Sequence, residues 1–205
     1  MKPALAILAL TLALPAGADP MPVAAQGCAD CHGENGASTQ PDVPIIGGLS
    51  AFSLEENLYA FRERERPCRA TYYRVGDTDR PATDMCRIAR ELSDDDIVAV
   101  ARFFASQPFV PANQPFDAER AERGRAIHQS ACHNCHGDGG SDPADHASIL
   151  AGQWMNYLRM AFMHLRADQR WMPKAMKARL GRLSDADVED LVNFYGSGAA
   201  RHAAP

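Results

Sequence analysis

The sequence lacks an excess of basic residues and any long stretch that alternates polar and apolar residues. Its 205 residues include 21 lysines and arginines against 26 aspartates and glutamates, a formal net charge of −5. Nucleic acid is therefore not expected as a partner, because its binding needs a basic surface. The missing alternation argues against a β-rich fold, and no G-x-G-x-x-G motif marks a dinucleotide or flavin site in this chain.

Long apolar runs are also missing beyond the N-terminus. Residues 1–18 have the features of a secretory signal peptide, with Lys2 before the apolar residues 4–14 and the small residues Ala16-Gly17-Ala18 at the cleavage site. The apolar run is short for a membrane span, although an uncleaved anchor is the alternative. We expect an exported, periplasmic protein whose mature chain begins at Asp19 and contains no membrane span.

One motif occurs twice, as Cys28-Ala-Asp-Cys31-His32 and as Cys132-His-Asn-Cys135-His136. C-x-x-C-H is typical of covalent haem c attachment, because both sulfurs lie on one side of a helical turn and the next residue can reach the iron. A thioredoxin-like dithiol would need a βαβ setting, and a shared zinc site would have to join pairs 104 residues apart. The sequence thus predicts two covalently bound haems c. Their attachment residues would be Cys28, Cys31, Cys132 and Cys135, with His32 and His136 as axial ligands.

The rest of the chain repeats in step with these motifs. Ile46-Gly-Gly48 corresponds to Leu150-Ala-Gly152 at the same offset of 104, whereas Leu92-Ser-Asp-Asp-Asp-Ile97 corresponds to Leu183-Ser-Asp-Ala-Asp-Val188 at an offset of 91. The first half therefore carries about 13 additional residues between Arg66 and Leu92.

The apolar spacing within each half is helical. It predicts helices over 54–64, 94–105, 154–165 and 185–195, and N-caps at Ser93 and Ser184 with an acidic residue three positions on. Residues 107–116 contain three prolines and read as an extended linker. We expect an all-α protein with domain 1 over 19–106, this linker, and domain 2 over 117–205.

Methionine is the expected second ligand of each iron, since His with Met raises the reduction potential. Met85 lies seven residues before Leu92 and Met176 lies seven before Leu183, so this pair is in register with the repeat. Core packing is the ordinary role of a buried methionine, and His164 is the alternative ligand in the second half.

Three other residues are candidates for supporting the haem sites. The Pro44 carbonyl could accept from the ring N–H of His32, whereas the second half has Ser148 at that position. Arg66 and Arg170 occupy matching positions and could pair with haem propionates; the alternative is that they are solvated surface residues.

Two cysteines belong to neither motif. Cys68 and Cys86 flank the inserted residues, and an even pair left over in an exported protein is usually a disulfide. The alternative is Cys86 as a thiolate ligand, which would lower the potential of the first haem.

The paired halves with in-register methionines resemble the dihaem class I cytochromes c of the c-four type. The linker Phe109-Val-Pro-Ala-Asn-Gln-Pro-Phe116, the block Leu150-Ala-Gly-Gln-Trp154 and residues 166–176 are similar to the cytochrome subunit of flavocytochrome c sulfide dehydrogenase. The resemblance implies two tandem class I cytochrome c domains related by pseudo-twofold symmetry.

The resemblance also implies a function. It suggests an electron-transfer subunit, not an enzyme by itself, that docks on a flavoprotein carrying FAD, takes electrons from sulfide oxidation and passes them to a soluble cytochrome c. A free-standing dihaem carrier that delivers electrons to a terminal oxidase is the alternative. A dihaem enzyme with an open iron site is disfavoured, because both methionines are present.

Overall fold

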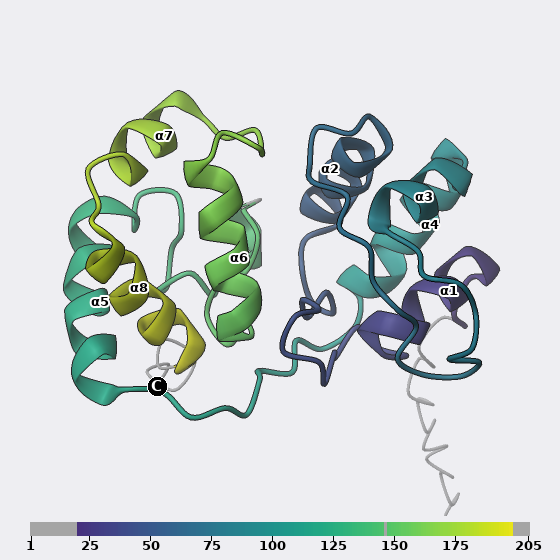
Figure 1. The fold of residues 1–205 in the computed structure, drawn as a ribbon, viewed down its shortest axis with the longest axis horizontal. Coiled ribbons are helices and arrows are strands. Elements are labelled where there is room, and N and C mark those ends of the chain that lie inside the picture. Colours follow the sequence, from purple (N-terminus) through teal and green to yellow (C-terminus); the bar gives the residue numbers. More distant parts are fainter. Residues whose placement is uncertain (1–19, 146, 199–205) are drawn as a thin grey trace, which may run out of the picture.

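The computed structural model describes residues 20–145 and 147–198, which form two helical halves side by side (Figure 1). The predicted signal peptide lies outside the described residues. The first half holds α1 (Val23–His32), α2 (Ala51–Arg62), α3 (Met85–Glu91) and α4 (Asp94–Ala105). The second half holds α5 (Ala118–Ala131), the short 3₁₀ helix η1 (Pro143–Asp145), α6 (Met155–Arg166), α7 (Lys174–Leu180) and α8 (Asp185–Gly196).

The all-α prediction is confirmed. Over the described ranges the only β-type pairing is an isolated bridge between Thr71 and Thr83. No helix in this part of the chain is long and apolar enough to cross a membrane.

The structure follows the sequence repeat element by element. Helices α2 and α6 are related by the offset of 104, and α4 and α8 by the offset of 91. Both predicted N-caps are confirmed as complete capping boxes, in which Ser93 pairs with Asp96 and Ser184 pairs with Asp187. These boxes fix the first turn of the last helix in each half.

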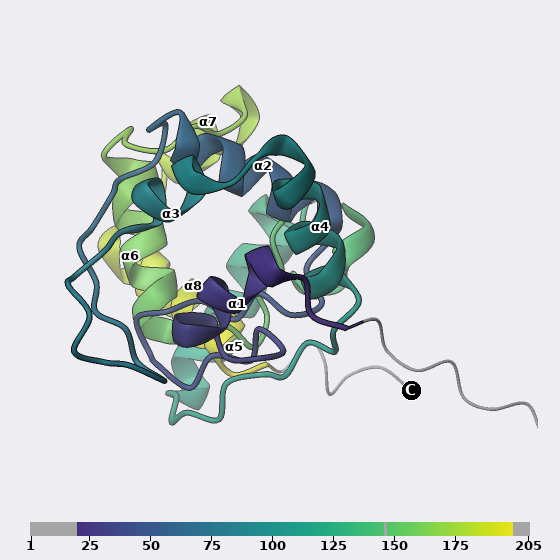
Figure 2. The same ribbon diagram turned by 90° about the vertical axis from the view of Figure 1, so that its right-hand side faces the viewer.

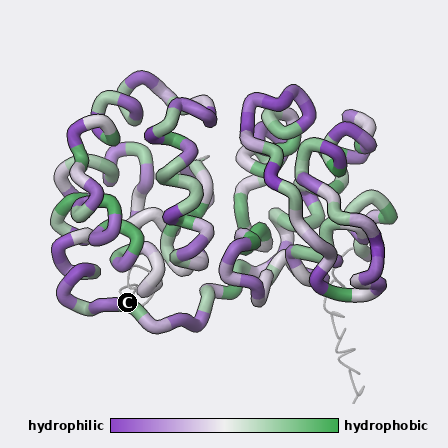
Figure 3. Tube along the Cα trace, viewed as in Figure 1, coloured by the Kyte–Doolittle hydropathy of each residue, from purple (hydrophilic) through white to green (hydrophobic). Residues whose placement is uncertain are grey.

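In each half the first helix packs against the last, α1 on α4 and α5 on α8. Each helix carries both hydrophobic and hydrophilic residues (Figure 3), and the buried apolar residues form two clusters, one within the second half and one in the first half that also includes Ile149. Gly124 on α5 permits the close approach of α8, because a Cβ there would overlap the Asp190 carbonyl and the Phe194 side chain.

Residues 107–116 run extended between the halves, along the lower edge in Figure 1. The linker is bonded to the second half, since the Ala112 N–H donates to the Gly152 carbonyl at 2.8 Å and the Gln114 amide donates to the Gln153 carbonyl at 2.8 Å. Its Phe109 lies against Gly48 and Gly152, whose positive φ angles place their backbones close to it.

Buried polar contacts join the halves directly. The Gln153 side chain accepts from the Ile45 N–H at 3.0 Å and donates to the Ile45 carbonyl at 2.6 Å. The Trp154 indole donates to the Ser38 carbonyl at 2.8 Å, and Ser53 and Ser148 share a hydrogen bond of 3.1 Å. The two halves therefore share a specific interface in addition to the linker.

The additional residues of the first half lie in the connection between α2 and α3. We call residues 69–83 the inserted segment; it descends along the first half from α2 past α1 and returns to α3 (Figures 1 and 2). Cys68 and Cys86 are bonded to each other at its base, with their Cα atoms 5.6 Å apart and a sequence separation of 18. A disulfide leaves no thiolate for iron, so the structure does not favour Cys86 as a ligand.

We expect the double change Cys68→Ala, Cys86→Ala to lower the free energy of unfolding by about 3 kcal/mol, because a loop of this length loses its closure constraint in the unfolded chain. Urea titration of the haem-loaded protein measures this loss. Treatment of the double variant with a reductant should change nothing further, and an equal stability of variant and parent would contradict the prediction.

Candidate haem-binding sites

The first C-x-x-C-H motif occupies the last turns of α1. Cys28, Cys31 and His32 are all buried, and neither cysteine is in a disulfide. Burial, followed by the nearby Cys31 and Asp30, raises the pKa of Cys28 to about 11. Burial also raises the pKa of Cys31, and the two sulfurs lie on one helical turn, where they could add to the two vinyl groups of one haem.

His32 is oriented as an axial ligand would need to be. Its Nδ1 lies 2.9 Å from the Pro44 carbonyl, so this ring nitrogen donates and Nε2 keeps its lone pair. Burial lowers the pKa of His32, although the Pro44 carbonyl acts in the opposite direction. The predicted Pro44 contact is confirmed, and the imidazole is neutral at neutral pH, as iron ligation requires.

The second motif begins where α5 ends. Cys132 is the C-cap residue, and the following turn holds Cys135 and His136 through backbone bonds from both residues to the Cys132 carbonyl. Cys135 is exposed and Cys132 is partly buried. Burial lowers the pKa of His136, and its buried Nδ1 has no partner among the described residues. Ser148, at the position of Pro44, instead bonds Ser53 across the interface.

A buried histidine distinguishes the second half. His128 on α5 is fully buried, its Nδ1 shares a hydrogen bond of 3.0 Å with the Tyr195 hydroxyl, and Tyr195 also bonds Cys132. Burial, with smaller effects from His136 and His133, lowers the pKa of His128 to about 4.

This histidine predicts an acid-sensitive stability. Between pH 6.5 and 4 the His128 imidazole is protonated in the unfolded chain but stays neutral in the folded one. The free energy of unfolding is therefore highest above pH 6.5 and decreases as the pH falls through this range. We expect wild type to lose about 2–3 kcal/mol more than His128→Gln between pH 7 and pH 4.5, measured by urea titration. Parallel losses in both proteins would contradict this role.

The two methionines in register lie in corresponding places. Met85 opens α3 and Met176 lies in the first turns of α7, each partly buried against the hydrophobic core of its own half. The core that Met85 contacts includes Cys28. His164, the alternative ligand, is on α6, where burial, followed by the charges of Arg69, Arg66 and Arg170, lowers its pKa. It therefore belongs to the interface between the halves.

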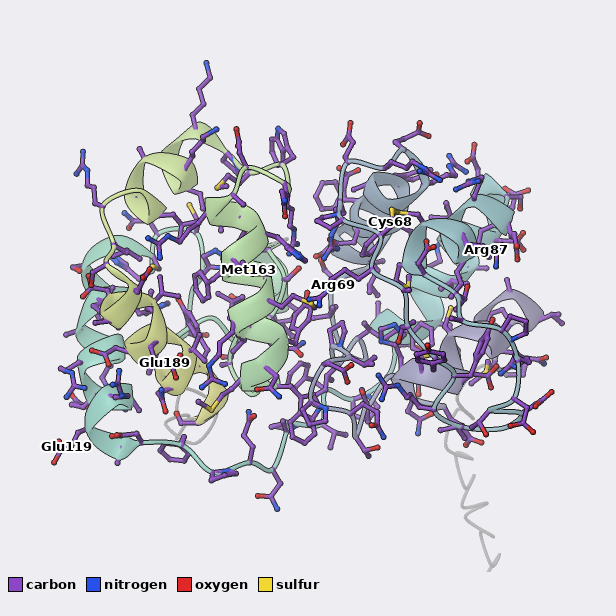
Figure 4. The ribbon with its side chains drawn as sticks, viewed as in Figure 1. Cys68, Arg69, Arg87, Glu119, Met163 and Glu189 are labelled. Atoms are coloured by element: carbon purple, nitrogen blue, oxygen red, sulfur yellow. A yellow bond between two sulfur atoms is a disulfide. The ribbon has the colours of Figure 1, made fainter. Side chains whose placement is uncertain are left out.

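Arg66 and Arg170 are not solvated surface residues. Both are half-buried at the interface and donate to the Oδ1 of Asn57 on α2, Arg170 at 3.2 Å. Both also bond the hydroxyl of Tyr157 on α6, and although burial raises the pKa of Tyr157, the two guanidinium charges lower it overall. Arg69 extends from the first half toward Met163 and α6 (Figure 4).

This cationic cluster has no anionic counterpart in the described part of the chain. Neither Arg66 nor Arg170 forms a salt bridge there, and the Nε of Arg66 is buried without a partner. Burial, followed by the charge of Arg170, lowers the pKa of Arg66 to about 10. Two cations placed together without a carboxylate fit the propionates of two haems. The residues present therefore suit the two groups that the motifs predict.

Sequence reasoning missed the polar contacts that organise this interface. No sequence pattern assigns a contact to Asn57 or to the hydroxyl of Tyr157, because their role depends on α2 and α6 meeting across the halves. Gln153 lies in the Leu150–Trp154 block, but its bonds to Ile45 could not be read from the chain. The His128–Tyr195 pair replaces Ala24 and Phe104 of the first half, a difference that the repeat alignment could have shown.

Comparison with known families agrees with these sites. The family described as "Cytochrome c" matches residues 22–108, and the family described as "Cytochrome C oxidase, cbb3-type, subunit III" matches residues 119–194. Each half thus matches a cytochrome c family of its own, which supports two covalently bound haems c.

Individual relatives extend the likeness over most of the chain. Cytochrome c4 of Thiocapsa roseopersicina is 26% identical over 173 residues, which cover 78% of this chain and 81% of the relative. Cytochrome c-554(548) of Halomonas halodenitrificans is 34% identical over 80 residues, covering 39% of this chain and 83% of the relative. The structure of Acidithiobacillus ferrooxidans cytochrome c4 superposes with a TM-score of 0.68 at 23% identity, covering 84% of this chain and 99% of that one.

Proposed function

Because each half matches a cytochrome c family and most of the chain is similar to cytochromes named c4, we propose that it is a dihaem, c4-type cytochrome c that carries electrons, one at a time, between redox partners outside the cytoplasm. The observation that carries this proposal is the pair of C-x-x-C-H sites in halves that share one cationic cluster. A covalently held haem c supplies a one-electron ferric/ferrous couple. On this proposal the chain is a carrier and not an enzyme by itself.

The chain's own residues would attach, orient and insulate the two groups. Cys28, Cys31, Cys132 and Cys135 would form the thioether bonds, and His32 with Met85 and His136 with Met176 would ligate the two irons. Pro44 fixes the orientation of the His32 ring. Arg66 and Arg170 would neutralise haem propionates where the halves meet, and the two hydrophobic cores would exclude water.

Two versions of this carrier function are candidates. The full-length likeness to cytochromes named c4 supports a free-standing periplasmic carrier that delivers electrons to a terminal oxidase. The linker and the Leu150–Trp154 block support the second candidate, in which the chain is the cytochrome subunit of a sulfide-oxidising flavoprotein that carries FAD and passes its electrons on to a soluble cytochrome c.

Isolation of the exported protein from its native periplasm tests both. Two haems c per chain and a reversible two-electron titration are expected in either case, and their absence would overturn the carrier function. Stoichiometric flavin in the same fraction, together with haem reduction by sulfide, would establish the flavoprotein assembly. Two haems without flavin would establish the free-standing carrier.

A further inference from the structure

The two haem-attachment motifs differ in their exposure. In the first motif Cys28 is 6% exposed and Cys31 is 9% exposed, whereas in the second Cys132 is partly buried and Cys135 is exposed. The motifs have the same spacing, but the first lies within α1 and the second follows the end of α5, and they also differ in what lies over them.

The inserted segment covers the first motif. The backbone N–H groups of Arg74 and Val75 donate to the carbonyl of Asp30, which stands between the two cysteines, at 3.1 and 3.0 Å. The Arg80 guanidinium donates to the Asp30 carboxylate at 2.6 Å, and the Cys31 sulfur lies 3.9 Å from the Tyr72 carbonyl. Asn134, the counterpart of Asp30 in the second motif, is exposed.

The inserted segment is held in this place at several points. The disulfide closes its base, and Thr71 and Thr83 pair through two backbone bonds of 2.7 and 2.9 Å. Arg80 stacks on the Tyr73 ring with its guanidinium carbon 3.5 Å from the ring centre, and Arg74 forms an ion pair of 2.8 Å with Asp42. The second half has no equivalent, since residues 167–173 connect α6 directly to α7.

These contacts bear on electron exchange, because the thioether bonds place one edge of each haem against its cysteines and transfer between proteins weakens steeply with distance. We propose that the inserted segment closes the thioether edge of the first haem to outside redox proteins, so that a soluble redox protein exchanges electrons over residues 133–135 of the second half. The first haem then exchanges with that partner through the second.

This inference rests on the proposed function, since it needs both haems. Each exchange moves one electron and makes or breaks no bond. The surface over the second motif presents His133 and Asn134 to solvent, and nothing among the described residues lies across it as the inserted segment lies across Asp30.

NMR of the oxidised, two-haem protein tests whether the inserted segment covers the thioether edge of the first haem. A neutral, soluble gadolinium chelate speeds the relaxation of the haem-methyl signals that it can approach. We expect the methyl beside the Cys135 thioether to relax several-fold faster than the one beside Cys31. Replacing residues 72–82 by Asn-Gly keeps the disulfide and the Thr71–Thr83 pair, with a turn that suits a tight hairpin. It should make the two rates similar.

A single substitution tests the same contact without shortening the chain, so that misfolding of the shortened variant would not decide the result. Arg80→Gln removes the contacts to Asp30 and Tyr73 and should raise the relaxation at the first haem, whereas Arg87→Gln, on the exposed side of α3 (Figure 4), should not. Equal relaxation of both haems in the wild type, or no change in a shortened variant that retains two haems, would overturn the cover.

A second experiment tests whether electrons are exchanged over residues 133–135. One negative charge is added over each motif, and the rate at which ferricyanide oxidises the reduced protein is measured at low salt. Asn134→Glu should slow the reaction several-fold by repelling this anion, and Tyr72→Glu, 65% exposed in the parent, should change it little. The opposite order would overturn the proposal. A chain that lacks two haems c would instead overturn the proposed function, which the absorption spectrum reports separately.

Discussion

Replacing Met176 with His should lower the reduction potential of the second haem and leave the first unchanged. His/Met ligation holds a haem at a higher potential than two nitrogen ligands do. We expect a fall on the order of 0.1–0.3 V, a part of the roughly 0.8 V that axial ligands can span. The change is large because the ligand is bonded to the iron itself, and a spectroelectrochemical titration would show one of two waves displaced.

Met85→His is the partner experiment and should displace the other wave. Met163→His is the matched control, since Met163 is 54% exposed on α6 and should affect neither potential. If Met176→His moved neither wave while Met172→His moved one, the register of the repeat would have identified the wrong methionine.

Changing Gln153 to Leu should cause the largest loss of stability among single substitutions at the interface. The side chain is 2% exposed and satisfies both the N–H and the carbonyl of Ile45, itself 1% exposed. Leucine would leave two buried backbone groups without partners, at about 1–3 kcal/mol each. We therefore expect the free energy of unfolding to fall by about 2–5 kcal/mol.

The control is the same substitution at Gln169, an exposed residue of the same half, which should change stability by less than about 0.5 kcal/mol. Calorimetry should also show a qualitative difference. The halves of the wild type should unfold in one transition, and those of Gln153→Leu in two. A single transition of unchanged midpoint in the variant would show that the linker and the remaining contacts suffice to join the halves.

Much of the fold could be read from the sequence, because its signals are local. The capping boxes at Ser93 and Ser184 depend on residues three apart, and helical periodicity depends on residues three and four apart. The C-x-x-C-H motif predicts haem attachment from five consecutive residues. The repeat offsets of 104 and 91 even placed the additional residues of the first half.

The sequence by itself determined helices α2, α4, α6 and α8, the duplication, the attachment motifs and the expected methionine pair, since each is encoded in short spacings or in their repetition. Only the tertiary structure decided which surfaces meet. It joined Gln153 to Ile45, brought Arg66 and Arg170 together on Asn57, and laid the inserted segment across Asp30. These contacts link residues far apart in the chain, and no local pattern specifies them, because they arise from how two folded halves and one long connection pack.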